Sequence, residues 1–72
     1  MQLFAAVMLW HIVIVPSNSN RLVVLPDTYP TEMECMNDPG PPLRSRIEEA
    51  VNAYVAAHGG DVSRTRAYCS QG

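Results

Sequence analysis

An apolar run near the N-terminus, residues 3–15, limits what this 72-residue chain can fold into more than any other feature. Only His11 interrupts the run, and Pro16 ends it. β-Branched residues are frequent in its second half, as is typical of strands. Odd and even positions are both apolar, as in a strand that is covered on both sides. Thirteen extended residues would span about 43 Å, so we expect a bend near Ala5–Ala6 or a strand that begins later.

Two targeting interpretations of this run fit less well. A membrane-spanning helix needs about 20 apolar residues, and the run has 13. A secretory signal begins with a positively charged segment, whereas only Met1 and Gln2 precede the run. We therefore interpret it as a structural strand and expect a cytoplasmic protein without membrane contact. A secreted or periplasmic protein is the alternative, and the mass of the mature protein would distinguish the two.

Two further strands are predicted. Turn-forming residues 16–20 lead into a second strand over residues 21–25, which Pro26 ends, so the first two strands form a hairpin. A third strand is predicted over residues 62–69, where small side chains alternate with larger ones. Its small residues would lie under a helix and the others would face away: Ser63, Thr65, Ala67 and Cys69 on one face, and Val62, Arg64, Arg66 and Tyr68 on the other.

Two helices are predicted between the second and third strands. Thr31, followed three residues later by Glu34, fits a capping box and begins a short helix. The proline-rich residues 37–42 end that helix. Apolar residues then recur at helical spacing over residues 42–58, and the glycines at 59–60 supply a left-handed C-cap.

These elements predict a single α+β domain over residues 1–72. The most apolar strand belongs in the centre, so we expect a three-stranded antiparallel sheet of order 2-1-3, with chain order ββααβ. The long helix would lie on one face, with the short helix before it. This fold would bring Cys69 towards Cys35. The sequence leaves open whether the two are bridged or reduced; a bridge would add roughly 3–4 kcal/mol.

One helix can cover only one face of the sheet, so apolar residues of the first strand should remain exposed in a monomer. Exposed patches of this kind mark partner surfaces, and we expect a homodimer or a dedicated protein partner. The alternative is that the chain ends and the proline-rich loop cover the face. The candidate partner-binding residues are Phe4, Met8, Trp10, Ile12, Asp27, Glu32, Glu34, Asp38, Arg64, Arg66 and Tyr68.

Four of these candidates form an acidic segment. Residues 27–38 contain four acids and no base. Acids near a helix N-terminus are favoured by the helix dipole. The same acids could engage a basic groove on a protein partner, where charge complementarity sets the on-rate and partner choice. The two interpretations are compatible.

The composition argues against nucleic-acid binding and against catalysis. The net charge is −2, whereas a nucleic-acid binder would carry a basic excess. The two cysteines and two histidines lack the spacing of a zinc site, and no phosphate-binding or catalytic motif is present in the sequence. We therefore expect no cofactor, no metal and no enzyme. A small enzyme or metal protein that uses His11 or His58 remains the contrasting hypothesis.

Several short segments of the chain carry a resemblance: Val24-Leu25-Pro26, Thr28-Tyr29-Pro30-Thr31-Glu32, Cys35 and Arg64-Thr65-Arg66-Ala67-Tyr68-Cys69. The chain resembles small uncharacterised proteins of alphaproteobacteria and their phages, which have an apolar first strand, an amphipathic helix and two spaced cysteines. That family has no assigned activity, so the resemblance implies no catalytic residues. The inserted residues 39–42 depart from its continuous helix.

In its size, its acidity and its lack of cofactor motifs, the chain also resembles the anti-CRISPR class of inhibitors. That class is diverse in sequence, so the resemblance is one of protein type only. The leading hypothesis is a non-enzymatic module that binds a host defence or nucleic-acid-processing complex stoichiometrically. The alternative is a small secreted or periplasmic domain stapled by a disulfide.

Overall fold

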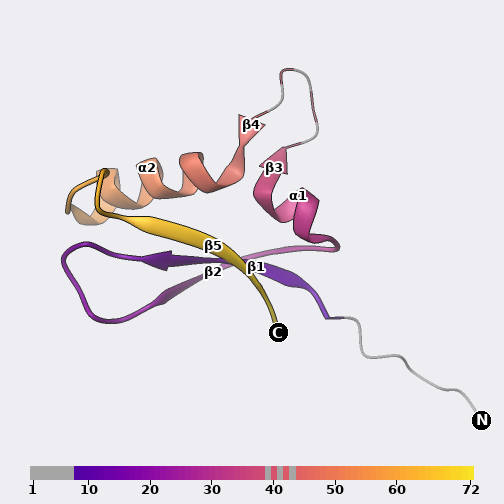
Figure 1. The fold of residues 1–72 in the computed structure, drawn as a ribbon, viewed down its shortest axis with the longest axis horizontal. Coiled ribbons are helices and arrows are strands. Elements are labelled where there is room, and N and C mark those ends of the chain that lie inside the picture. The colour runs from indigo at the N-terminus through magenta and orange to yellow at the C-terminus, as the bar shows by residue number, and fades with distance from the viewer. Residues whose placement is uncertain (1–7, 39, 41, 43) are drawn as a thin grey trace, which may run out of the picture.

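The computed structural model describes residues 8–38, 40, 42 and 44–72. Strands β1, β2 and β5 form an antiparallel sheet in the order β2-β1-β5, and α2 lies along one face of it (Figure 1). This confirms the predicted α+β fold and strand order. In chain order, the elements are β1 (Trp10–Val15), β2 (Val23–Tyr29), α1 (Glu32–Met36), β3 (Asn37–Asp38), β4 (Arg44–Ser45), α2 (Arg46–His58) and β5 (Arg66–Gln71).

The core lies between the sheet and the two helices. Ile12 and Ile14 of β1 and Cys35 of α1 form its buried centre. Alternation along β1 points these two isoleucines to the helix side. A disulfide joins Cys35 to Cys69 of β5, with 6.2 Å between the Cα atoms. The bridge, which the sequence left open, ties the short helix to the last strand.

The first strand is described from Trp10 onwards. Its predicted start, together with the bend expected near Ala5–Ala6, lies outside the described residues. The second strand differs from the prediction, because β2 begins at Val23 and runs past Pro26 to Tyr29. His11 pairs with Thr28 and Val13 pairs with Val24. Between these two pairs, β1 advances by two residues and β2 by four, so β2 contains a bulge.

This irregularity explains how a proline is accommodated inside a strand. Pro26 lies in the bulged stretch of β2, between the paired positions Val24 and Thr28. β2 is also an edge strand. Proline is found in sheets at edges and bulges, because no neighbouring strand needs its missing N–H there. The expectation that Pro26 ends the strand was therefore wrong.

The short helix begins as predicted. The Thr31 side chain accepts a hydrogen bond from the backbone N–H of Glu34 (3.1 Å), as an N-cap should. The long helix begins later than expected, at Arg46 and not at residue 42. Arg44 and Ser45 instead form β4, which pairs with β3 in a two-stranded sheet that the sequence pattern does not predict.

Ser45 sets the start of α2, because its side chain accepts a hydrogen bond from the backbone N–H of Glu48 (3.2 Å). We expect Ser45→Ala to lower the free energy of unfolding by about 1 kcal/mol, because the Glu48 N–H loses its cap. Urea denaturation followed by circular dichroism measures this. Ser45→Asp is the matched control, since a carboxylate also caps, and it should stay close to wild type. Equal losses in the two variants would contradict the capping role.

The third strand also begins later than predicted, at Arg66 and not at Val62. The preceding residues form a turn around Asp61. Its carboxylate accepts hydrogen bonds from the N–H and the hydroxyl of Ser63 (2.9 and 2.8 Å), and its carbonyl accepts one from the buried hydroxyl of Thr65 (2.8 Å). Residues 62–65 therefore alternate like a strand in sequence but form a turn in the structure.

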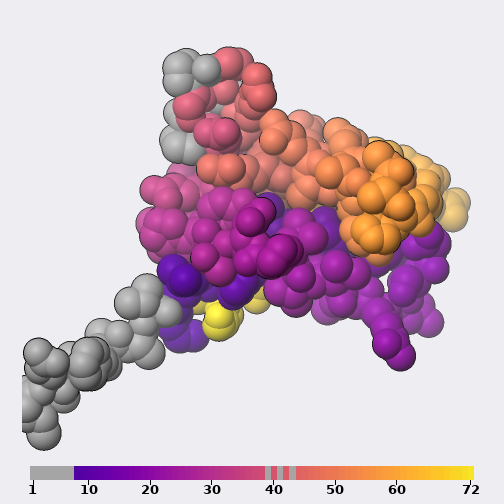
Figure 2. Space-filling view, turned by 180° about the vertical axis from the view of Figure 1, so that it is seen from behind, coloured from indigo at the N-terminus to yellow at the C-terminus, as the bar shows by residue number. Residues whose placement is uncertain are grey.

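The end of α2 packs against the hairpin between β1 and β2. Gly59 and Gly60 have positive φ angles of 82° and 103°, as the predicted C-cap requires, but the ψ angle of Gly59 is −173° and differs from that of the left-handed helical conformation. The backbone N–H of Asp61 donates to the Ser17 hydroxyl (2.8 Å). A Cβ on Gly60 would lie 2.7 Å from that hydroxyl oxygen, so this close approach requires glycine. Figure 2 shows the orange residues after α2 against the purple hairpin loop.

Candidate interaction surface

The face of the sheet opposite α2 carries an apolar row, which we call the open face. Val24 of β2, Val13 of β1 and Tyr68 of β5 lie directly across from one another. Val24 is 60% exposed and Tyr68 is 45% exposed, while Val13 between them is only 5% exposed. Both described helices pack on the other face, with Ile12 and Ile14. Within the described part of the chain, this row is therefore available to another molecule.

A row of polar groups runs beside the apolar row. His11 of β1 lies between Thr28 of β2 and Ser70 of β5. Its Nε2 atom is 3.2 Å from the backbone carbonyl oxygen of Gly72. A shallow hollow of about 280 Å³ is lined by residues of both rows, including His11, Val13 and Val24. The open face thus combines an apolar strip with hydrogen-bonding groups, a composition common at protein interfaces.

The structure separates the predicted apolar candidates. Ile12 is 4% exposed and Trp10 packs against the core beside it, both on the helix side of the sheet. Met8, just before β1, is 50% exposed, and Phe4 lies outside the described residues. The apolar residues of β1 on the open face are those that alternate with Trp10, Ile12 and Ile14, and Val13 is one of them.

The acidic candidates do not form one cluster. Glu32 and Glu34 are exposed in the first turn of α1, where the helix dipole favours acids. Asp38 in β3 accepts a hydrogen bond from the backbone N–H of Gly40 (3.0 Å). Asp27 lies apart from these three, in the bulged part of β2. Helix and turn geometry therefore account for three of the four acids.

The candidates of the last strand lie near its start. Arg66 donates to the backbone carbonyl of Ser63 (3.4 Å). Arg64 lies 4.0 Å from the Asp61 carboxylate, and both side chains are more than half exposed. An exposed pair of this kind adds little stability. The two arginines thus keep most of their capacity to contact a partner.

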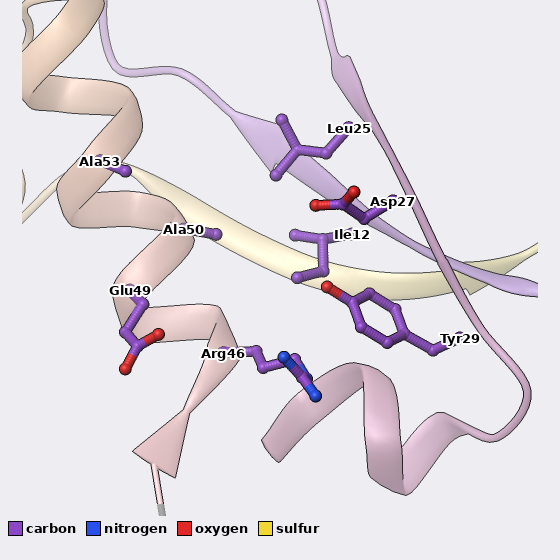
Figure 3. Close-up of a pocket in the computed structure, with 8 residues that line it drawn as sticks. All are labelled: Ile12, Leu25, Asp27, Tyr29, Arg46, Glu49, Ala50 and Ala53. Atoms are coloured by element: carbon purple, nitrogen blue, oxygen red, sulfur yellow. The ribbon is translucent and has the colours of Figure 1, made fainter. Parts of the chain in front are cut away.

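A second concave site lies between β2 and α2 (Figure 3). It measures about 320 Å³. The Arg46 guanidinium stacks over the Tyr29 ring, 4.7 Å from its centroid, and its Nε donates to the Glu34 carbonyl oxygen (2.7 Å). These contacts fix Arg46 as a link between α1, α2 and β2. The groove is lined by Ile12, Leu25, Asp27, Tyr29, Arg46, Glu49, Ala50 and Ala53.

The disulfide bears on the chemical hypotheses. Because Cys35 and Cys69 are bonded to each other, neither supplies a thiolate for a metal or for nucleophilic attack. In the described ranges, no three side chains among His, Cys, Asp and Glu are grouped so that they could hold a metal ion. His58 stacks on Tyr54, with ring centroids 4.3 Å apart, and its Nδ1 lies 3.2 Å from the Tyr54 carbonyl oxygen.

Comparison of the chain with protein-family models, curated proteins and solved structures finds no match. Among the described residues, no helix has the length and apolar character needed to cross a membrane.

Sequence reasoning missed several residues of these surfaces. The sequence predicts a strand at Val24 but does not place Val24 on the interaction surface, because its exposure depends on the register with β1. Arg46 and Tyr29 are 17 residues apart, and no local pattern signals their contact. The alternation of the last strand did correctly indicate that Tyr68 faces away from the helix.

Proposed function

We propose that this chain is a non-enzymatic protein-binding module that contacts its partner through the open face. The observation that carries the proposal is the row of Val24, Val13 and Tyr68, of which the two outer side chains are about half exposed or more. Leu22, which precedes β2, adds a further side chain that is 56% exposed. A partner that covers these residues would bury apolar surface, which is the main driving force of association.

The charge distribution supports a protein partner over a nucleic acid. The net charge is −2, and six of the seven acids lie between Asp27 and Glu49. A chain with this net negative charge suits a partner with a basic patch. Stoichiometric inhibition of a host defence or nucleic-acid-processing complex, as by anti-CRISPR proteins, is the form of binding that we propose, because basic grooves are a feature of nucleic-acid-binding complexes.

The open face is tested by a charged substitution at its most exposed position. We expect Val24→Lys to reduce the recovery of a specific partner in pull-downs from host extract by about tenfold or more, because a buried unpaired charge opposes association. Quantitative mass spectrometry of the recovered proteins provides the measurement.

The matched control for this test is Met33→Lys. Met33 is 69% exposed in α1, on the helix side of the sheet, so the same change there should leave recovery unchanged. If the two variants recover the partner equally well, the open face is not the binding surface.

The second candidate function is that of a small secreted or periplasmic domain stapled by a disulfide. The Cys35–Cys69 bridge favours it, because disulfides persist in oxidising compartments. Thiol titration of unfolded protein, isolated from its host without reductant, should then find no free thiol, and the mature mass should show a cleaved N-terminus. Free thiols together with an uncleaved N-terminus would instead favour the cytoplasmic inhibitor.

A further inference from the structure

The two edges of the main sheet differ in how well they are protected. β2, at one edge, is interrupted by the bulge and by Pro26, features that keep an edge strand from pairing with another chain. β5, at the other edge, pairs with β1 in unbroken register from Arg66 to Gln71. Six regularly extended residues thus form an edge that carries neither a proline nor a bulge.

The direction of the backbone groups along β5 follows from one hydrogen bond. The N–H of Gly72 donates to the carbonyl of Leu9 (3.2 Å), so the backbone groups of residue 72 face β1. Because these groups alternate along an antiparallel strand, those of Ala67 and Cys69 point away from β1. They can form a second ladder with a further strand.

A groove follows this edge on the helix side. Two hollows of about 430 and 470 Å³ lie between α2 and β5, and they share Ile47 and Ala67 as lining residues. Two exposed hydrophobic side chains also line them: Val62 (48% exposed) in the first hollow and Met36 (43%) in the second. The edge therefore offers apolar contacts along with the outward-facing backbone groups of Ala67 and Cys69.

The two ends of β5 differ in charge. Arg64 and Arg66 lie at its start. Towards its other end, Glu32 of α1 lines the groove together with Cys69, and Glu34 is in the same short helix. Consider a strand that binds antiparallel to β5 and that is also basic at its start and acidic near its end. Its basic end would lie beside the acidic end of the β5 groove.

We propose that the strand that fits this edge is β5 of a second copy of the chain, paired antiparallel about a two-fold axis at Tyr68. This register places Ala67 opposite Cys69 of the second copy, so that the outward backbone groups of both strands meet. The two-fold axis brings the Met36 end of each groove towards the Val62 end of the other. It also joins the two apolar rows into one row across a six-stranded sheet, which enlarges the open face but does not depend on its function.

Sedimentation equilibrium of the oxidised chain tests the proposal. We expect a dimer of twice the 7.9 kDa chain mass. Tyr68→Lys should weaken dimerisation about tenfold or more, because it removes an aromatic pair at the axis and places two like charges opposite each other. Val24→Lys is the matched control: it lies on the same face but away from the β5 edge, and it should leave the dimer intact.

Ala67→Pro provides an independent second variant. The Ala67 N–H points away from β1, so its loss leaves the β1–β5 ladder intact but removes a bond to the second copy. We expect a monomer whose circular dichroism matches that of wild type. A wild-type chain that stays monomeric at about 1 mM, or a dimer that Val24→Lys disrupts while Tyr68→Lys does not, would overturn the proposal. Either outcome leaves the pull-down test of the open face unaffected.

Discussion

Replacing both cysteines by alanine should lower the free energy of unfolding by about 3–4 kcal/mol, because the disulfide closes a long loop in the unfolded chain. Cys35 and Cys69 are 34 residues apart, and Cys35 is fully buried at the centre of the core. In a domain of this size, that loss should lower the melting temperature by about 15–30 °C. Thermal unfolding followed by circular dichroism is the measurement.

Reductant provides the control for this prediction. Reduced wild-type protein should melt close to the double variant, and the double variant should not respond to reductant. If reductant leaves the melting temperature of the wild-type protein unchanged, the bridge does not hold the fold together. Because small domains bury little apolar surface and have only marginal stability, the loss of the bridge should remove a large share of the total stability.

Ile14→Ala should cost about 2–5 kcal/mol, since it removes a side chain with 0% exposure from the central strand. Ile14 packs between the sheet and the helices, where the neighbouring side chains can only partly fill the cavity. Urea denaturation should therefore show a lower midpoint with an unchanged slope.

Val24→Ala is the matched control for the core. Val24 belongs to the neighbouring strand but is 60% exposed on the open face, so its truncation should change the stability by no more than about 0.5 kcal/mol. Similar losses from the two variants would mean that the open face is packed as tightly as the core, which would also weaken the proposed binding surface.

The sequence predicts most of the element order, because local chemistry specifies it. Thr31 caps its helix as the capping box indicates, and the most apolar strand does occupy the centre of the sheet. Pro26 shows where local rules fail: its position in β2 depends on a bulge, and the bulge arises from pairing with β1. The start of α2 at Arg46 follows from the cap that Ser45 provides, which competes with the signal of the preceding prolines.

The orientation of β1 could not be predicted for a different reason. Both of its faces are apolar, so hydropathy does not determine which face the helix covers. The pairing of Ile12 with Cys69, and of Cys69 with Cys35, settles it, because these residues must then share one side of the sheet. That information lies in contacts between distant residues, which a single sequence does not reveal.

The position of β5 beside β1 has a consequence for synthesis. Trp10 pairs with Gln71, so the central strand cannot complete its hydrogen-bonded ladder until residue 71 has left the ribosome. Until then, the emerging chain carries an apolar strand that can pair only with β2. The pairing of β1 with β5 joins segments far apart in the sequence, and pairing of that kind forms slowly. Chaperones therefore have time to bind the apolar strand before β5 reaches it.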